Sequence, residues 1–204
     1  MARLILVTGF APFGGEHTNP SWEVAERLDG TEITDTTVKA LRLPVNCGRA
    51  ARLVSEAIEG LRPRAVLGLG QAGGRPALSV EKVAINVADG RASREVDGGV
   101  QGKPVVRGGP DAYFSRLPVA EILRTLKKRG IPVGLSLSAG VYVCNSVMYA
   151  ALHTLRRRRD VPAGFIHLPY EAAQAVRHRA AASMSAEVMA NGIEFALEVI
   201  ARRL

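Results

Sequence analysis

The sequence predicts an α/β fold, a single-domain three-layer α/β/α sandwich built on a twisted, largely parallel open sheet. Short apolar runs of strand-like composition alternate with amphipathic stretches of helical period along the 204 residues. Hydrophobic residues make up 47% of the chain, which is enough for a large core. No internal repeat and no linker interrupts the alternation, so residues 1–204 are expected to form one domain.

Each expected strand is a short run of apolar, often β-branched residues. The runs are Leu4–Thr8, Val38–Leu43, Ala65–Leu69, Val83–Val87, Val133–Leu137 and Gly164–His167. The first run is interpreted as a buried strand and not as a signal peptide, because glycines and a proline follow it without a small-residue cleavage pattern. We therefore expect a cytoplasmic protein whose two cysteines are free thiols.

The expected helices lie between these strands. Asn19 followed by Pro20 is a helix-start signal, and Gly130 with Pro132 is a stop signal. The helical stretches are Trp22–Leu28, Arg49–Leu61, Val119–Arg129, an apolar stripe over 147–155, and Glu187–Leu204. The polar, glycine-rich stretch 88–110 is long for a loop, and such loops are usually functional or mobile.

The chain is basic, with 27 Lys and Arg against 19 Asp and Glu and a net charge of +8. The run Arg156–Arg159 follows a helical stretch, where cations interact favourably with the carboxyl end of the helix dipole. Aromatic residues are only 5% and are not interleaved with the basic ones, so no nucleic-acid partner is expected. The apolar runs are too short to span a membrane, so no membrane partner is expected.

Three glycines after the third strand match a dinucleotide fingerprint in spacing only. Gly68, Gly70 and Gly73 form a GxGxxG pattern, but only four residues separate Gly73 from the strand-like stretch that starts at Leu78. A dinucleotide fold needs a helix at that point, and a helical crossover needs about a dozen residues. The pattern is therefore interpreted as a turn at the carboxyl end of a strand, where open α/β sheets bind ligands.

Two cysteines are candidates for chemistry. Cys144, in "SAGVYVCNSVMY", lies where a strand-like run meets a helical pattern, and Cys47 has a similar position. The dipole and the N–H groups of a helix N-terminus favour the thiolate, which is the attacking form. Both cysteines are equally well explained as small buried hydrophobic residues, so position alone does not choose between them.

A thiol nucleophile needs a base and an orienting partner. Among the four histidines, His167 ends an apolar strand and is expected at the ligand-binding edge of the sheet. Glu81 is an acid within an otherwise apolar strand, and it needs a partner if it is buried. Each residue also has a purely structural explanation. His167 could be bonded to a backbone carbonyl at the end of its strand, and Glu81 could face outward from a half-exposed strand.

Long, ordered segments of the chain resemble the pyroglutamyl peptidase type I family of cysteine peptidases. They are "LVTGFAPFGGEHTNPS", "GLGQAGGRPALSVEKVAINVADGR", "DAYFSRLPV", "SAGVYVCNSVMYAAL" and "GFIHLPY". The resemblance implies a catalytic triad of Glu81, Cys144 and His167, with Cys47 outside the catalytic blocks. It also implies hydrolysis of N-terminal pyroglutamyl residues from peptides through a thioester, without metal or cofactor.

The resemblance further implies a pocket and an assembly. The backbone N–H of Cys144 and the side chain of Arg91 are expected to bind the oxyanion. The substrate pocket is expected from Phe10, Phe13, Asn19, Gln71 and Tyr142, although the two phenylalanines also suit loop residues that pack on the core. Active members are commonly homotetramers, so a homo-oligomer is expected. The stretch after Arg91 and the residues Val141 and Tyr142 depart from the family pattern.

Two other function classes stay open from the residues alone. One is a non-peptidase, nucleoside-processing hydrolase on a similar sandwich, which would not need Cys144. The other is an RNA-binding protein that uses the basic surface.

Overall fold

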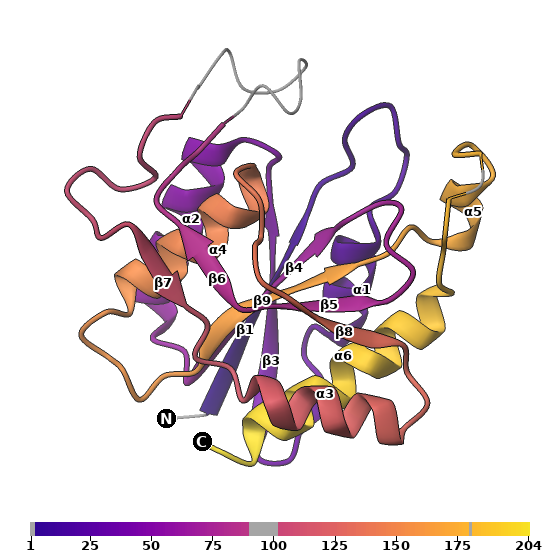
Figure 1. Ribbon diagram of the computed structural model, residues 1–204. Coiled ribbons are helices and arrows are strands. Elements are labelled where there is room, and N and C mark those ends of the chain that lie inside the picture. The colour runs from indigo at the N-terminus through magenta and orange to yellow at the C-terminus, as the bar shows by residue number, and fades with distance from the viewer. Residues whose placement is uncertain (1–2, 90–101, 180) are drawn as a thin grey trace.

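A computed structural model describes residues 3–89, 102–179 and 181–204 of the chain (Figure 1). Its strands are β1 (Arg3–Phe10), β2 (Glu32–Ile33), β3 (Thr36–Leu43), β4 (Ala65–Gln71), β5 (Leu78–Glu81), β6 (Val83–Ile85), β7 (Ala112–Phe114), β8 (Val133–Ser136) and β9 (Ala163–Leu168). Its helices are α1 (Pro20–Leu28), α2 (Cys47–Leu61), α3 (Val119–Lys128), α4 (Val143–Thr154), α5 (Ala172–Ala175) and α6 (Ala186–Ala201). None of the helices in the described residues is both long and apolar enough to cross a membrane.

Seven strands form one open sheet in the order β2-β3-β1-β4-β9-β5-β8. The pairs β1–β3, β1–β4, β4–β9 and β5–β8 are parallel, whereas β2–β3 and β5–β9 are antiparallel. The largely parallel open sheet predicted from the alternating pattern is therefore confirmed. Because β4 and β9 run side by side in the same direction, their carboxyl ends meet at one edge of the sheet.

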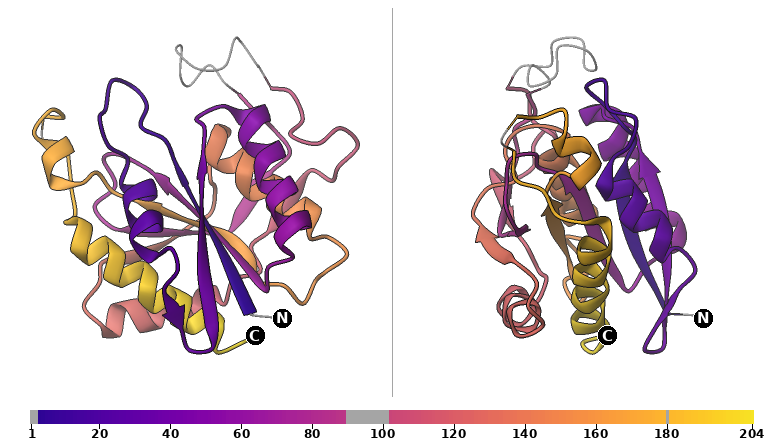
Figure 2. Two further views of the ribbon diagram at one scale, coloured as in Figure 1. Left: turned by 180° about the vertical axis from the view of Figure 1, so that it is seen from behind. Right: turned by 90° about the vertical axis from the view of Figure 1, so that its right-hand side faces the viewer.

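Helices cover both faces of the sheet, which gives the expected three layers (Figure 2). One core lies under α1, α3 and α6, and the other lies under α2 and α4. The central strands β1, β4 and β9 are apolar on both faces, because strands covered on both sides cannot alternate with polar residues. In the left view of Figure 2, α1 and α6 lie on one side of the molecule and α2 lies on the other.

Local signals set most boundaries close to where the sequence places them. Asn19 caps α1 by accepting a hydrogen bond from the Ser21 N–H, and Pro20 occupies the first turn. Asn46 caps α2 in the same way. No helix follows β4, which confirms that the glycine pattern is not a dinucleotide fingerprint. Gly68 and Gly70 lie within the strand itself, and only Gly73 lies in the turn expected for all three.

The expected strand Val83–Val87 is shorter in the structure and is not part of the main sheet. The strand-like stretch around it splits at Lys82, so that β5 joins the main sheet and β6 pairs with β7 in a separate two-stranded sheet. Apolar composition predicted extended backbone here, but it could not show that the chain changes sheets, because that depends on partners far along the sequence.

Candidate active site

The end of β9 places His167 on the face of the sheet that α2 and α4 cover. Side chains alternate between faces along a strand. Ile166 and Leu168 belong to the core under α1, α3 and α6, and Phe165 belongs to the opposite core. His167 therefore shares a face with Phe165, and their ring centroids lie 4.9 Å apart. The histidine is buried, with 5% of its surface exposed.

Glu81, the last residue of β5, is the hydrogen-bond partner of His167. Its Oε1 lies 2.7 Å from the Nδ1 atom of His167, and the glutamate is fully buried. A carboxylate can only accept, so Nδ1 carries the proton and donates. The Nε2 lone pair is thereby left for another group, which is the arrangement that a general base needs.

Arg75 is a second partner of Glu81 that the sequence analysis did not identify. Its Nη1 donates to the same Oε1 atom at 2.8 Å from the turn after β4. Burial by itself would raise the pKa of Glu81, but the bonds and charges of His167 and Arg75 and the nearby Ser136 hydroxyl outweigh it. The net pKa of Glu81 lies below its ordinary value, so the group is a carboxylate at neutral pH.

Cys144 lies in the first turn of α4, next to the strand position that pairs with His167. A Cβ on Gly70 would lie only 2.7 Å from the Sγ atom of Cys144, so the thiol rests directly on that glycine. Gly70 of β4 is the register partner of His167 in β9. The structure thus brings the three predicted triad residues to one place, from β5, α4 and β9.

Asn145 fixes the start of α4. This buried residue accepts a hydrogen bond from the Ile85 N–H and donates to the carbonyls of Ile85 and Val87. No side chain caps α4 at Tyr142 within the described residues. The first turn of α4, which holds Cys144, is therefore of the kind whose backbone N–H groups can bind an anionic oxygen.

The unliganded thiol of Cys144 is held in its neutral form. Burial, with a smaller contribution from the Glu81 carboxylate and from Cys47, raises the pKa of Cys144 to about 12. The expected preference of a helix start for the thiolate is therefore outweighed by burial at Cys144. Removing a charge from water outweighs the dipole here, because burial penalises the charged form.

Beside Cys144 lies a small, partly open cavity of about 30 Å³. It is lined by all five residues expected for the substrate pocket together with Val45, Val143 and Cys144; the five are Phe10, Phe13, Asn19, Gln71 and Tyr142. The volume is close to that of one water molecule, so a five-membered ring can enter only if lining side chains move. Phe10 is also buried in the core, where its ring centroid lies 6.5 Å from that of Phe165.

The two polar residues that line the cavity, Asn19 and Gln71, differ in the hydrogen-bonding groups that they can offer to a substrate. The Oδ1 atom of Asn19 accepts from the backbone and hydroxyl of Ser21, and its Nδ2 donates to the Ala11 carbonyl. Asn19 therefore mainly holds the start of α1 beside the cavity. Gln71 has its Oε1 atom occupied by Gln174, which leaves its amide nitrogen as a donor.

Gln174, buried in α5, determines which end of Gln71 is used. Its Oε1 accepts from the Glu171 N–H, so its Nε2 is the end that donates to the Thr18 carbonyl and to Gln71. This role could not be predicted from the sequence, because Gln174 lies 103 positions from Gln71 and shares no motif with it. Only the packing of α5 against the end of β4 reveals the pair.

The remaining expected site residues fall elsewhere. Arg91 lies outside the described residues. Cys47 is buried at the start of α2 and lines a different cavity of about 370 Å³, with Lys103 and Ser146 among its walls.

The sequence profile of the pyroglutamyl peptidase family matches residues 3–203. The chain belongs to this family. It is 46% identical over 199 residues to a pyrrolidone-carboxylate peptidase of Klebsiella pneumoniae (strain 342), covering 98% of this chain and 93% of that protein. It is 44% identical over 201 residues to the pyrrolidone-carboxylate peptidase of Enterobacter sp. (strain 638), covering 98% and 94%.

Solved structures of pyroglutamyl peptidases have the same fold. A mutant pyrrolidone carboxyl peptidase from the hyperthermophile Pyrococcus furiosus superposes with a TM-score of 0.93 at 38% identity, covering 98% of each chain. Pyroglutamyl peptidase I from Bacillus amyloliquefaciens superposes with a TM-score of 0.92 at 34% identity, covering 98% of this chain and 96% of that one. The peptidase class is thereby favoured over the two other classes that the residues alone left open.

Proposed function

We propose that the chain hydrolyses the bond after an N-terminal pyroglutamyl residue, with Cys144 as nucleophile, His167 as base and Glu81 as the residue that orients His167. The observation that carries the triad is the buried bond between Glu81 and His167 next to the glycine on which the Cys144 thiol rests. Membership of the pyroglutamyl peptidase family supports the reaction and the substrate class.

The resting state of the site favours proton transfer at the moment of attack. With the pKa of Cys144 at about 12 and Nδ1 of His167 bonded to Glu81, the thiol keeps its proton until the substrate is bound. His167 Nε2 then accepts this proton while sulfur bonds to the pyroglutamyl carbonyl carbon. The imidazolium so formed is stabilised by the buried carboxylate of Glu81.

The remaining steps use the same groups. The oxygen of the tetrahedral intermediate is bound by the backbone N–H of Cys144 at the start of α4, with Arg91 as the further donor that the family resemblance implies. As the carbon–nitrogen bond breaks, His167 gives its proton to the departing amine and a thioester remains. Water, deprotonated by His167, then attacks the thioester, and Cys144 recovers its proton as pyroglutamate leaves.

The residues that line the cavity beside Cys144 account for the preference of the enzyme for a pyroglutamyl ring. Phe10, Phe13 and Tyr142 supply flat apolar walls, and the amide nitrogen of Gln71 supplies a donor suited to the lactam carbonyl. Residues 1–204 act in this proposal as one catalytic domain that needs no metal or cofactor. The enzyme is proposed to work in the cytoplasm, where Cys47 and Cys144 stay reduced.

A homo-oligomer, a tetramer by family resemblance, is part of the proposal. The edge strand β8 supports it, because Leu135 and the following Leu137 are 51% and 70% exposed there. Exposed leucines on an unpaired sheet edge suit contact with a second copy of the chain. Light scattering after gel filtration tests this, with Leu137→Lys expected to lower the measured mass.

The central experiment uses a fluorogenic amide of pyroglutamate. The wild-type protein should release the fluorophore, and Cys144→Ser should not. A wild-type protein that is folded but inactive on this amide would contradict the proposed function.

A further inference from the structure

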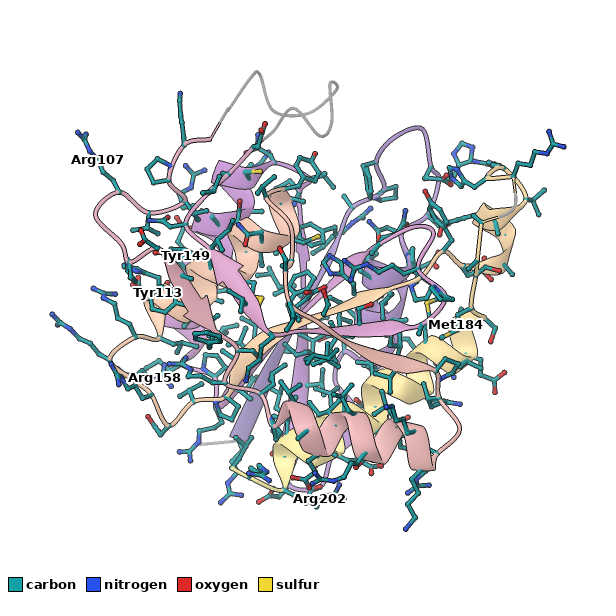
Figure 3. All side chains as sticks on the ribbon, in the orientation of Figure 1. Arg107, Tyr113, Tyr149, Arg158, Met184 and Arg202 are labelled. Atoms are coloured by element: carbon teal, nitrogen blue, oxygen red, sulfur yellow. The ribbon has the colours of Figure 1, made fainter. Side chains whose placement is uncertain are left out.

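The chain between β9 and α6 makes an excursion that contacts the loop carrying Phe13. The excursion begins at Tyr170 and closes at Met184, whose N–H donates to the Tyr170 carbonyl at 2.9 Å. Met184 is buried in the core and is labelled between α5 and α6 in Figure 3. Figures 1 and 2 both show α5 beside the loop of residues 11–18, here called the Phe13 loop. The contacts between them therefore bear on one wall of the substrate cavity.

Glu16 of the Phe13 loop is bonded to this excursion. Its Oε1 lies 2.7 Å from Nε2 of His178, and its Oε2 lies 3.8 Å from Nη1 of Arg177. Only 10% of the Glu16 side chain is exposed, against 37% for His178. A carboxylate that has lost most of its contact with water needs such partners, and it accepts from the Nε2 N–H. The bond joins two segments that lie 162 positions apart.

His178 is in turn held against the ends of the central strands. Its ring is stacked on that of Tyr170, with the centroids 4.3 Å apart and the planes inclined by 6°. The Tyr170 ring packs directly on Gly73, where a Cβ would overlap the ring. Gly73 lies in the turn after β4, and Tyr170 follows β9. The position of Glu16 is therefore set relative to the strands that carry Gln71 and His167.

A single tight turn links Glu16 to Phe13. The Glu16 N–H donates to the Phe13 carbonyl at 3.1 Å, and Gly14 and Gly15 between them have φ of 64° and 77°. Positive φ at both central positions is the pattern of a primed turn, which glycine adopts without strain. A displacement of Glu16 is therefore passed to the backbone of Phe13.

Phe13 is the aromatic wall of the cavity that depends most on this connection. Phe10 belongs to β1 and is buried in the core, and Tyr142 directly precedes α4. Phe13 lines the same cavity, but it is only half-buried and lies in neither a strand nor a helix. When a binding wall is correctly placed for only part of the time, the apparent affinity falls by that fraction.

We propose that Glu16 and His178 are positioning residues for the substrate pocket, and that their bond holds Phe13 in place to contact the pyroglutamyl ring. The inference rests on the proposed function, because it assigns a further part of the same site. The triad comes from β5, α4 and β9, so breaking this bond leaves the reacting groups in place. The pair therefore acts on KM and much less on kcat.

Steady-state kinetics on the fluorogenic pyroglutamyl amide test the pair. Glu16→Ala and His178→Ala should each raise KM about 5- to 10-fold, with kcat changed less than about 2-fold. Glu16→Gln keeps an acceptor for Nε2 and should raise KM less than about 3-fold. His17→Ala is the matched control, because His17 is an exposed neighbour in the same loop, and it should leave both constants unchanged. A lower Tm with unchanged KM in the two alanine variants would show a purely structural bond and overturn the proposal.

A double variant and a binding measurement complete the test. Because either substitution breaks the same bond, Glu16→Ala combined with His178→Ala should raise KM no more than one of them alone. The Kd of 2-pyrrolidone, the bare five-membered lactam, should rise by the same factor in calorimetry, which needs no turnover. A wild-type protein that binds this lactam but leaves the amide intact would contradict the proposed function, while the Kd values would still test the pair. A lowered KM, additive effects in the double variant, or an equal change in His17→Ala would each overturn the positioning role.

Discussion

Nδ1 of His167 lies 2.7 Å from Oε1 of Glu81, and both side chains are buried. The two residues are separated by 86 positions in the chain and meet because β5 runs antiparallel beside β9. The bond fixes which imidazole nitrogen carries the proton, and it places a negative charge where an imidazolium will form. The predictions below depend on this pair and on the thiol beside it.

Replacing the nucleophile should abolish activity. Cys144→Ser is expected to lower kcat by about four orders of magnitude or more, as for other nucleophiles that act with a base. Cys47→Ser is the matched control and should remain active, because Cys47 lies at the start of α2 and lines a different cavity. Rates on the pyroglutamyl amide decide between them. An active Cys144→Ser together with an inactive Cys47→Ser would reverse the assignment.

Removing the charge of Glu81 should lower kcat and leave the fold intact. In Glu81→Gln the amide cannot balance the imidazolium, and a loss of about 10²- to 10⁴-fold is expected. Arg75→Gln removes the other partner of the same oxygen and should cost much less, because the bond to His167 remains. Circular dichroism checks the fold. Full activity of folded Glu81→Gln would make this residue structural only.

The same carboxylate should make stability depend on pH in the acid range. The pKa of Glu81 is lower in the folded than in the unfolded chain, so its stabilising contribution is complete above the unfolded pKa near 4.3. That contribution is lost as the pH falls through the lower, folded pKa. Urea unfolding between pH 3 and 6 should show a steeper acid loss for wild type than for Glu81→Gln. Parallel curves would show that Glu81 does not contribute to this dependence.

The resting thiol should be slow to alkylate at neutral pH. With the pKa of Cys144 at about 12, iodoacetamide labelling without substrate should accelerate throughout the alkaline range, with no plateau between pH 6 and 9. Peptide mass spectrometry separates Cys144 from Cys47. A fast plateau near neutral pH that disappears in a His167→Ala variant would instead indicate a thiolate–imidazolium pair in the free enzyme.

Specificity for the lactam should depend on Gln174 as well as on the cavity walls. Gln174→Glu replaces the donor that faces the Oε1 atom of Gln71, so the Gln71 amide should turn and lose its donor toward the substrate. We expect a higher KM for the pyroglutamyl amide with a smaller change in kcat. Unchanged kinetics would show that Gln71 is not oriented by this contact.

The wild-type enzyme should also reject proline by a factor of about 10⁴ in kcat/KM. The prolyl amide has the same ring size but lacks the lactam carbonyl, and its charged amine would enter a cavity whose lining holds no carboxylate. The comparison uses the two amides with one leaving group. A ratio near one would contradict the pocket assignment even if Cys144 is the nucleophile.

The sequence by itself determined the fold class, most of the longer strands and helices, and the candidates for chemistry. Alternating apolar runs and helix caps such as Asn19 are local signals, and local signals fix strands and helices wherever burial agrees with them. The long motifs around Cys144 and His167 also indicated the family before any contact was known.

Only the tertiary structure decided how those candidates act. In the register of β4 with β9, Gly70 is the partner of His167, and the Cys144 thiol rests on Gly70. Burial raises the pKa of Cys144, whereas the helix start alone would lower it. The roles of Arg75 and Gln174 came from side-chain contacts, to a residue six positions away for Arg75 and 103 positions away for Gln174. Such contacts are not encoded in local pattern, because desolvation and pairing depend on what the whole fold brings together.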